Sequence, residues 1–141
     1  MNIYLAGPMQ GYKDFNFPAF HRAAAELRKK GHTVLSPAEI DIGVLGEEAF
    51  KSETGDMREA VDKGFNLRAA LYSDTKYICL YADAIALLPG WERSPGAQAE
   101  HRLAVALDLV IIYLITENTR LEQWRGTMAA ALALNVEIRE T

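Results

Sequence analysis

Short apolar runs that alternate with helical patterns are the feature that most constrains how this chain can fold. The runs cover residues 3–6, 32–35, 84–88 and 109–115, with a weaker one at 136–138. Runs of this length are typical of strands that are buried on both faces in a parallel sheet. Even the run at 109–115 is far shorter than the ~20 residues that a membrane-spanning helix needs. We therefore expect buried strands and no membrane segment.

Helical patterns fill the intervals between these runs. Residues 17–31 carry apolar side chains at helical spacing and end at a glycine, residues 66–81 show a second such pattern, and Ser94-Pro95 is a favourable helix start. The polar, glycine-containing stretch 41–64 is predicted to be a mobile lid or loop with room for short helices. Because strand and helix alternate almost throughout, we predict an α/β fold. Its sheet should be a doubly wound, flavodoxin-like parallel sheet of about five strands, in a single domain spanning residues 1–141.

Composition and charge limit the partners of the chain. The formal net charge is -4, and acidic and basic residues are interleaved, so no basic stripe is available for a polynucleotide. The lone Cys79 has no internal disulfide partner, and the first residues lack the features of a secretory signal, which predicts a cytoplasmic protein. His21, His32 and His101 are not clustered in the manner of metal ligands. We therefore expect neither a metal nor a cofactor.

The loop after the first predicted strand is one candidate ligand contact. In a doubly wound sheet, ligands bind at the carboxyl ends of the strands. The loop has the sequence Gly7-Pro8-Met9-Gln10-Gly11-Tyr12, and its glycines let backbone amides approach an anionic group. It matches neither the dinucleotide-binding glycine pattern nor the Walker loop. Gly7 and Met9 are therefore candidate substrate contacts, with a plain tight turn as the alternative.

The segment from Trp91 to Glu100 is the second candidate. If Ser94 caps a helix, Glu100 lies about one and a half turns inside it. Gly96 and Ala97 then occupy the same face and leave it open for a ligand. The free amides and dipole at the helix start favour a bound anion and an ionised Glu100, which could attack an anomeric carbon. The alternatives are a solvated surface position for Glu100 and, for Trp91, packing at the loop instead of stacking on a base.

These residues together resemble the nucleoside 2-deoxyribosyltransferase-like superfamily and its nucleotide-hydrolysing branch, the deoxynucleoside 5'-monophosphate N-glycosidases. The resemblance spans about residues 2–112 and is carried by four places, namely the strand that contains Tyr4, then Asp74, then Ala82-Asp83-Ala84-Ile85, and then the segment from Ser94 to Glu100. It is most specific over residues 87–100, which also resemble an often phage-borne subgroup.

The resemblance implies a site and a reaction. Glu100 is the implied nucleophile, Tyr4 the hydroxyl that reaches it, and Asp74 the carboxylate that contacts the leaving base. Where the transferases that act on nucleosides tend to carry an acidic residue, this chain has Ser94. A neutral hydroxyl at a helix start suits a 5'-phosphate. We therefore predict a hydrolase that converts a (deoxy)nucleoside 5'-monophosphate into a free base and (deoxy)ribose 5-phosphate.

Two other functions stay open at this point. One is a deoxyribosyltransferase that exchanges one base for another, and the other is a catalytically silent nucleotide-binding module. Because a site in so small a domain is expected to be shallow, we also predict a homodimer or higher closed oligomer. In the superfamily that this chain resembles, the part beyond residue 116 often lends a side chain to the neighbouring subunit.

Overall fold

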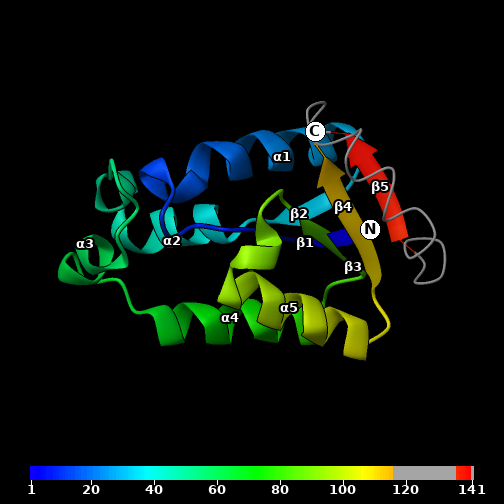
Figure 1. Ribbon diagram of the computed structural model, residues 1–141. Helices are drawn as coiled ribbons and strands as arrows, with labels where there is room; N and C mark the ends of the chain where they lie inside the picture. Colours follow the sequence, from blue (N-terminus) through cyan, green and yellow to red (C-terminus); the bar gives the residue numbers. More distant parts are fainter. Residues whose placement is uncertain (116–135, 141) are drawn as a thin grey trace.

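The protein is built around a five-stranded parallel sheet in the order β2-β1-β3-β4-β5 (Figure 1). The computed structural model describes residues 1–115 and 136–140. This strand order is that of flavodoxin-like folds, so the predicted doubly wound sheet is confirmed. The strands are β1 (Asn2–Ala6), β2 (Thr33–Leu35), β3 (Ala84–Leu87), β4 (Val110–Ile115) and β5 (Val136–Glu140).

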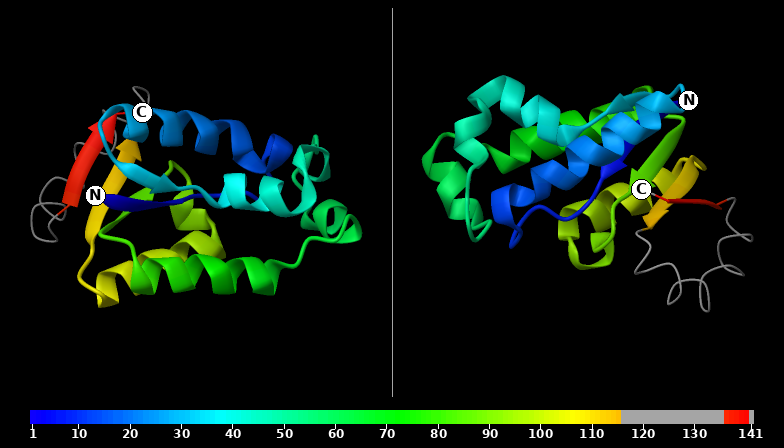
Figure 2. Two further views of the ribbon diagram at one scale, coloured as in Figure 1. Left: turned by 180° about the vertical axis from the view of Figure 1, so that it is seen from behind. Right: turned by 90° about the horizontal axis from the view of Figure 1, so that it is seen from above.

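Helices cover both faces of this sheet. Helix α1 lies on one face and helices α4 and α5 lie together on the other, whereas α2 and α3 extend beyond the carboxyl ends of the strands (Figures 1 and 2). None of the helices within the described residues is long and apolar enough to cross a membrane. The α-helices are α1 (Phe17–Lys29), α2 (Pro37–Leu45), α3 (Met57–Asp62), α4 (Leu67–Leu80) and α5 (Pro95–Ala106), and the short 3₁₀ helices are η1 (Lys13–Asn16), η2 (Glu47–Phe50) and η3 (Trp91–Arg93).

Strand β1 divides the core into two halves because successive side chains of a strand point to opposite faces. Ile3 and Leu5 join the cluster under α1, whereas Tyr4 and Ala6 join the cluster under α4 and α5. All four are essentially inaccessible to solvent. Tyr4 thus brings a polar hydroxyl into the otherwise apolar layer between the sheet and α5.

Residues 41–64 contain the short helices for which the sequence left room, and they do not form the lid or loop that was the first expectation. Helix α2 begins before this stretch and continues into it, and α3 follows within it. The remaining loop is clasped to the β1–α1 loop by backbone hydrogen bonds from Gly11 N to Gly55 O (3.0 Å) and from Asp14 N to Ser52 O (2.7 Å). A Cβ on Gly55 would lie 2.2 Å from the Tyr12 carbonyl oxygen. Only glycine allows this approach, which fixes the two loops against each other.

Candidate active site

A cavity of about 640 Å³ lies at the carboxyl end of β1, between α2, α4 and α5. This is where ligands bind in doubly wound sheets, and the volume lies in the range of small-molecule sites. Its polar lining includes three carboxyl side chains and the start of α5. Lining residues are Ala6, Gly7, Pro8, Met9, Gln10, Tyr12, Phe20, Pro37, Asp41, Met57, Phe65, Leu67, Ala70, Leu71, Asp74, Arg93, Ser94, Pro95, Gly96, Ala97, Ala99 and Glu100.

Glu100 lines this cavity, and Tyr4, which is fully buried and not among the lining residues, holds the carboxyl group of Glu100. The Tyr4 hydroxyl donates a hydrogen bond of 3.0 Å to Glu100 Oε1. Glu100 faces the sheet because it shares the inner side of α5 with Ala97 and Ala104, and only 7% of it is exposed. The solvated surface position is therefore excluded for Glu100. A carboxylate in this position is held by a fixed donor and opens toward the cavity.

Asp74 and Asp41 complete a set of three buried carboxyl groups. Asp74 lies on the inner side of α4, one turn before Ile78, and is 9% exposed. Asp41 lies on α2 and is 8% exposed. Both line the cavity together with Glu100. Within the described residues, no group of three or more His, Cys, Asp or Glu side chains is arranged to hold a metal ion.

Burial dominates the protonation of these groups. It raises the pKa of Glu100 to about 8, with a further increase from the nearby charge of Asp74, while the Tyr4 hydrogen bond acts in the opposite direction. Burial likewise raises the pKa of Asp74 to about 6. For Asp41, burial and the charge of Asp74 raise the pKa to about 7. The pKa of Tyr4 is raised well above its usual value, chiefly by burial, so its hydroxyl stays a proton donor.

The sequence argument that the helix dipole favours an ionised Glu100 is therefore wrong, because the pKa of Glu100 is raised. Glu100 lies beyond the first turn of α5, where the effect of the dipole has largely faded. Desolvation of the carboxylate is the larger effect, and the nearby Asp74 adds to it.

The start of α5 provides the part of the cavity suited to an anion. Ser94 is the N-cap, as predicted, and its hydroxyl accepts a hydrogen bond from Ala97 N at 3.3 Å. A Cβ added to Gly96 would meet no atom within 4 Å, so packing does not require glycine there. The Gly96 amide lies in the first turn, whose amides lack intrahelical partners. Among the described lining residues, Arg93 is the only basic one.

The other predicted contacts are divided between the cavity and the core. Gly7 and Met9 line the cavity, and a Cβ on Gly7 would lie 2.7 Å from the Leu88 Cβ, so this glycine also lets β1 and β3 pack closely. Trp91 is not among the lining residues. Its ring packs against His101, with 4.5 Å between ring centroids, and 5.9 Å from the Tyr113 centroid. The structure therefore places Trp91 in the packing role and not beside a ligand in this cavity.

Asp41 and Arg93 were missed by the sequence analysis. A usable signal existed for Asp41, because Ser36-Pro37 repeats the helix start of Ser94-Pro95 directly after a predicted strand. Arg93 precedes the Ser94 cap, and its guanidinium donates a hydrogen bond of 3.4 Å to the Tyr12 hydroxyl across the cavity mouth. Nothing in the local pattern distinguishes this arginine from a solvated one.

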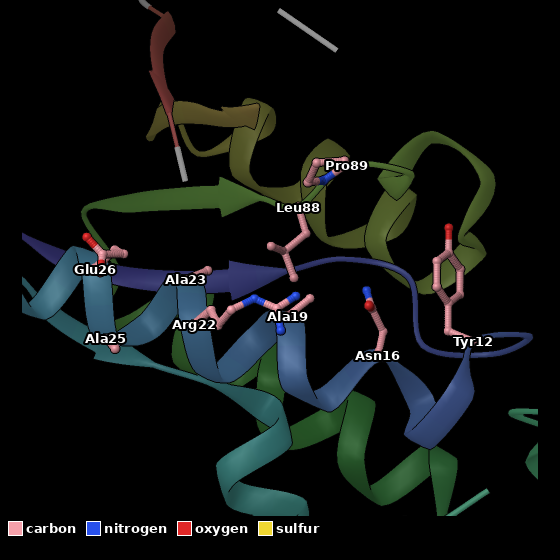
Figure 3. Close-up of a pocket in the computed structure, with 9 residues that line it drawn as sticks. All are labelled: Tyr12, Asn16, Ala19, Arg22, Ala23, Ala25, Glu26, Leu88 and Pro89. Carbon is pink, nitrogen blue, oxygen red and sulfur yellow. The ribbon is translucent and has the colours of Figure 1, made fainter. Parts of the chain in front are cut away.

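A second cavity, of about 610 Å³, opens beside α1 and shares Tyr12 with the first (Figure 3). Ala19 and Ala23 form much of its wall on α1, and Leu88 approaches from the end of β3. Arg22 and Glu26 are the charged side chains among its described lining residues. It has no buried carboxyl group, so the groups suited to covalent chemistry lie in the first cavity.

The fold and the cavity define an α/β protein with a carboxyl-lined site at the carboxyl end of its parallel sheet. Comparison with other proteins shows the family to which the chain belongs. The model of the domain of unknown function DUF4406 matches residues 1–113, and the chain belongs to this family. The matched region includes β1, α4 and α5, which supply Tyr4, Asp74 and Glu100. A comparison with curated proteins found no match.

Proposed function

We propose that the protein is an N-glycosidase that hydrolyses a (deoxy)nucleoside 5'-monophosphate to a free base and (deoxy)ribose 5-phosphate. The observation that carries the proposal is the 3.0 Å hydrogen bond between the Tyr4 hydroxyl and Glu100 Oε1 in a cavity of about 640 Å³. A buried carboxylate held by one donor has an oxygen left to attack an anomeric carbon. Asp74 lies close enough to influence both groups, as expected for a residue that assists the leaving base.

In the proposed reaction, ionised Glu100 attacks C1' of the sugar. The C1'–N bond breaks, its electron pair goes to the base, and an acidic carboxyl group beside the base donates a proton. The resulting glycosyl ester is then hydrolysed by water, which places a hydroxyl on C1' and releases Glu100 as a carboxylate. Tyr4 keeps the carboxylate in one orientation and lowers the pKa of Glu100, which makes more of it ionised at neutral pH.

The 5'-phosphate is assigned to the start of α5. Ser94, the Gly96 amide and Arg93 offer donors there, and three carboxyl groups lie along the rest of the cavity. The phosphate would therefore lie at the α5 start, and the sugar and base would extend along the carboxyl groups. This orientation places the anionic phosphate beside hydrogen-bond donors and away from the carboxyl groups.

A screen for free base is the direct test of this function. The full chain is incubated with each ribo- and deoxyribonucleoside monophosphate and with the matching nucleosides, and the free base is quantified by chromatography. We expect base release from at least one monophosphate and much less from its nucleoside. Absence of base release from every substrate, with nucleotide binding retained, would support a silent binding module instead. Incorporation of an added second base would identify a transferase.

Substitution of Ser94 by Asp tests the phosphate position separately. An aspartate also caps helices, so the fold should persist, but its carboxylate would repel a phosphate at close range. We expect Ser94→Asp to remove most kcat/KM for the monophosphate and to leave the nucleoside value nearly unchanged. An unchanged preference for the monophosphate would show that the phosphate binds elsewhere and would favour the transferase.

Assembly and compartment are part of the proposal as well. We propose that the protein acts in the cytoplasm as a homodimer or higher closed oligomer. The side chain that the resemblance would place beyond residue 116 lies outside the described residues. Light scattering at two protein concentrations would establish the oligomeric state.

A further inference from the structure

Asp41 is a buried carboxyl group to which the proposed reaction assigns no role. It lies on α2, it is 8% exposed, and it lines the same cavity as Glu100. Within the described residues, its carboxyl group has no hydrogen-bond partner, unlike that of Glu100. Buried carboxyl groups without a partner are costly and uncommon in folded proteins. A ligand in the cavity would supply the missing partner.

The three carboxyl groups come from three helices around the cavity, with Glu100 on α5, Asp74 on α4 and Asp41 on α2. Helix α4 contacts both α5 and α2, so Asp74 comes from the helix that lies between the other two. If the anomeric carbon lies at Glu100, a base that extends away from the start of α5 can reach Asp74 and Asp41.

We propose that Asp41 and Asp74 form an acid pair in which Asp41 holds the proton and delivers it to the departing base. The inference rests on the proposed N-glycosidase function and identifies the acid in it. Two neighbouring carboxyl groups in apolar surroundings keep a proton because both cannot readily be ionised together. Burial and the nearby charge of Asp74 raise the pKa of Asp41 to about 7, so Asp41 can carry a proton near neutral pH.

The proton balance of the reaction closes with this pair. As the C1'–N bond breaks, its electrons go to the base nitrogen, which takes the proton from Asp41. Asp41 is then a carboxylate. When water attacks C1' of the glycosyl ester, the water oxygen bonds to C1', and one water proton returns to the pair. Glu100 leaves as a carboxylate, and the enzyme is restored.

Proton donation by Asp41 can be distinguished from a structural role with a substrate whose leaving group needs no proton. The test uses a nucleoside monophosphate that the wild type cleaves, together with a 4-nitrophenyl (deoxy)riboside 5-phosphate, whose nitrophenolate departs unprotonated. We expect Asp41→Asn to lower kcat on the nucleotide about 100-fold, which is typical of a lost general acid, and to change kcat on the nitrophenyl compound less than about threefold. Asp62→Asn, on the exposed side of α3, is the matched control and should leave both rates unchanged.

The outcomes distinguish this inference from the proposed function. If Asp41→Asn lowers both rates equally, or leaves the nucleotide rate unchanged, the acid pair is wrong while the N-glycosidase function stands. If the wild type releases neither base nor nitrophenolate, both proposals fail. Circular dichroism checks the fold of each variant. If Asp41→Asn does not fold, Asp41→Ser takes its place with the same two substrates and the same expected split.

Discussion

Helices α2 and α5 both begin with serine followed by proline, and each carries a buried carboxyl group between one and two turns further on. Ser36 and Ser94 have nearly the same backbone conformation, with φ and ψ of -106° and 120° for Ser36 and of -100° and 113° for Ser94. Their side chains behave differently. The Ser94 hydroxyl caps α5, whereas the buried Ser36 hydroxyl has no hydrogen-bond partner within the described residues.

The carboxyl groups differ in the same way. Glu100 on α5 accepts a hydrogen bond from Tyr4, whereas Asp41 on α2 has no such donor within the described residues. Helix α5 is thus satisfied by the protein itself, and its carboxylate has a fixed orientation. Helix α2 leaves two polar groups near the cavity without partners. One helix therefore holds its carboxyl group in a fixed orientation, whereas the other leaves its carboxyl group available for a ligand.

The largest effect is expected when the carboxylate of α5 is neutralised. Glu100→Gln keeps the volume of the side chain and its contact with Tyr4 but removes the nucleophilic charge. We expect base release to fall roughly 1000-fold or more, with an unchanged circular dichroism spectrum. Retention of more than a few per cent of the wild-type rate would mean that Glu100 is not the nucleophile. The proposed difference in function between α5 and α2 would then be wrong.

Loss of the donor that distinguishes Glu100 from Asp41 should have a smaller effect. Tyr4→Phe removes the hydrogen bond that lowers the pKa of Glu100, so that pKa should rise above about 8. Because attack requires ionised Glu100, the ascending limb of the kcat/KM profile should move to higher pH, and turnover near pH 7 should fall about 10- to 100-fold. Profiles measured between about pH 6 and pH 10 test this expectation. Superimposable profiles would restrict Tyr4 to packing.

The stability of the protein should respond to the charge on both carboxyl groups. Their pKa values in the folded protein, about 8 for Glu100 and about 7 for Asp41, are raised by burial above the usual values of 4.5 and 3.8. The folded state therefore binds these protons more tightly, and the free energy of unfolding should fall as pH rises through this interval.

Variants in which the carboxyl group is replaced by a neutral amide should not show this fall in the free energy of unfolding. Glu100→Gln and Asp41→Asn are each expected to raise the free energy of unfolding at pH 8 by on the order of 2 kcal/mol, and each gain should be clearly smaller at pH 5, where less of the fall has occurred. Urea unfolding at both pH values measures the difference. Equal gains at the two pH values would show that volume and not charge is responsible.

The smallest expected effect is the difference in stability between alanine variants of the two serines. Ser94→Ala removes a helix cap and should cost about 1 kcal/mol of stability, whereas Ser36→Ala removes a hydroxyl without a partner and should cost nothing or stabilise slightly. Urea midpoints of the two variants provide the comparison. Ser94→Ala should also lower monophosphate turnover roughly tenfold through one lost contact to a charged group. Equal stability losses would mean that Ser36 has a partner in solution.

The doubly wound parallel sheet could be predicted because each strand is a short apolar run and each long helix carries its own periodic pattern. Helix α2 shows neither signal clearly, since it mixes apolar residues with Gly43 and has no polar side that repeats at helical spacing. Its start at Ser36-Pro37 can equally be taken as the end of a strand. The region from 41 to 64 was therefore assigned to a loop.

The site was predictable where a residue type and a helix cap occur together, as at Ser94 and Glu100. It was not predictable where burial comes from a distant element. Asp41 is desolvated by its burial in the folded protein, and Trp91 packs against His101 and Tyr113 instead of lining the cavity. Such tertiary contacts leave no periodic trace in the chain. The activity, in contrast, stays a prediction that depends on resemblance and geometry.

The clasp between the β1–α1 loop and residues 52–55 also determines when this site can form during folding. Asp14, Phe15 and Asn16 adopt left-handed φ values of 49°, 53° and 63°, which such residues avoid unless other contacts hold them. Those contacts come from Ser52, which lies 38 residues after Asp14. During synthesis, the β1–α1 loop therefore cannot adopt this conformation until β2, α2 and Ser52 have emerged from the ribosome. This part of the cavity wall is completed only after residues 52–55 are available to hold it.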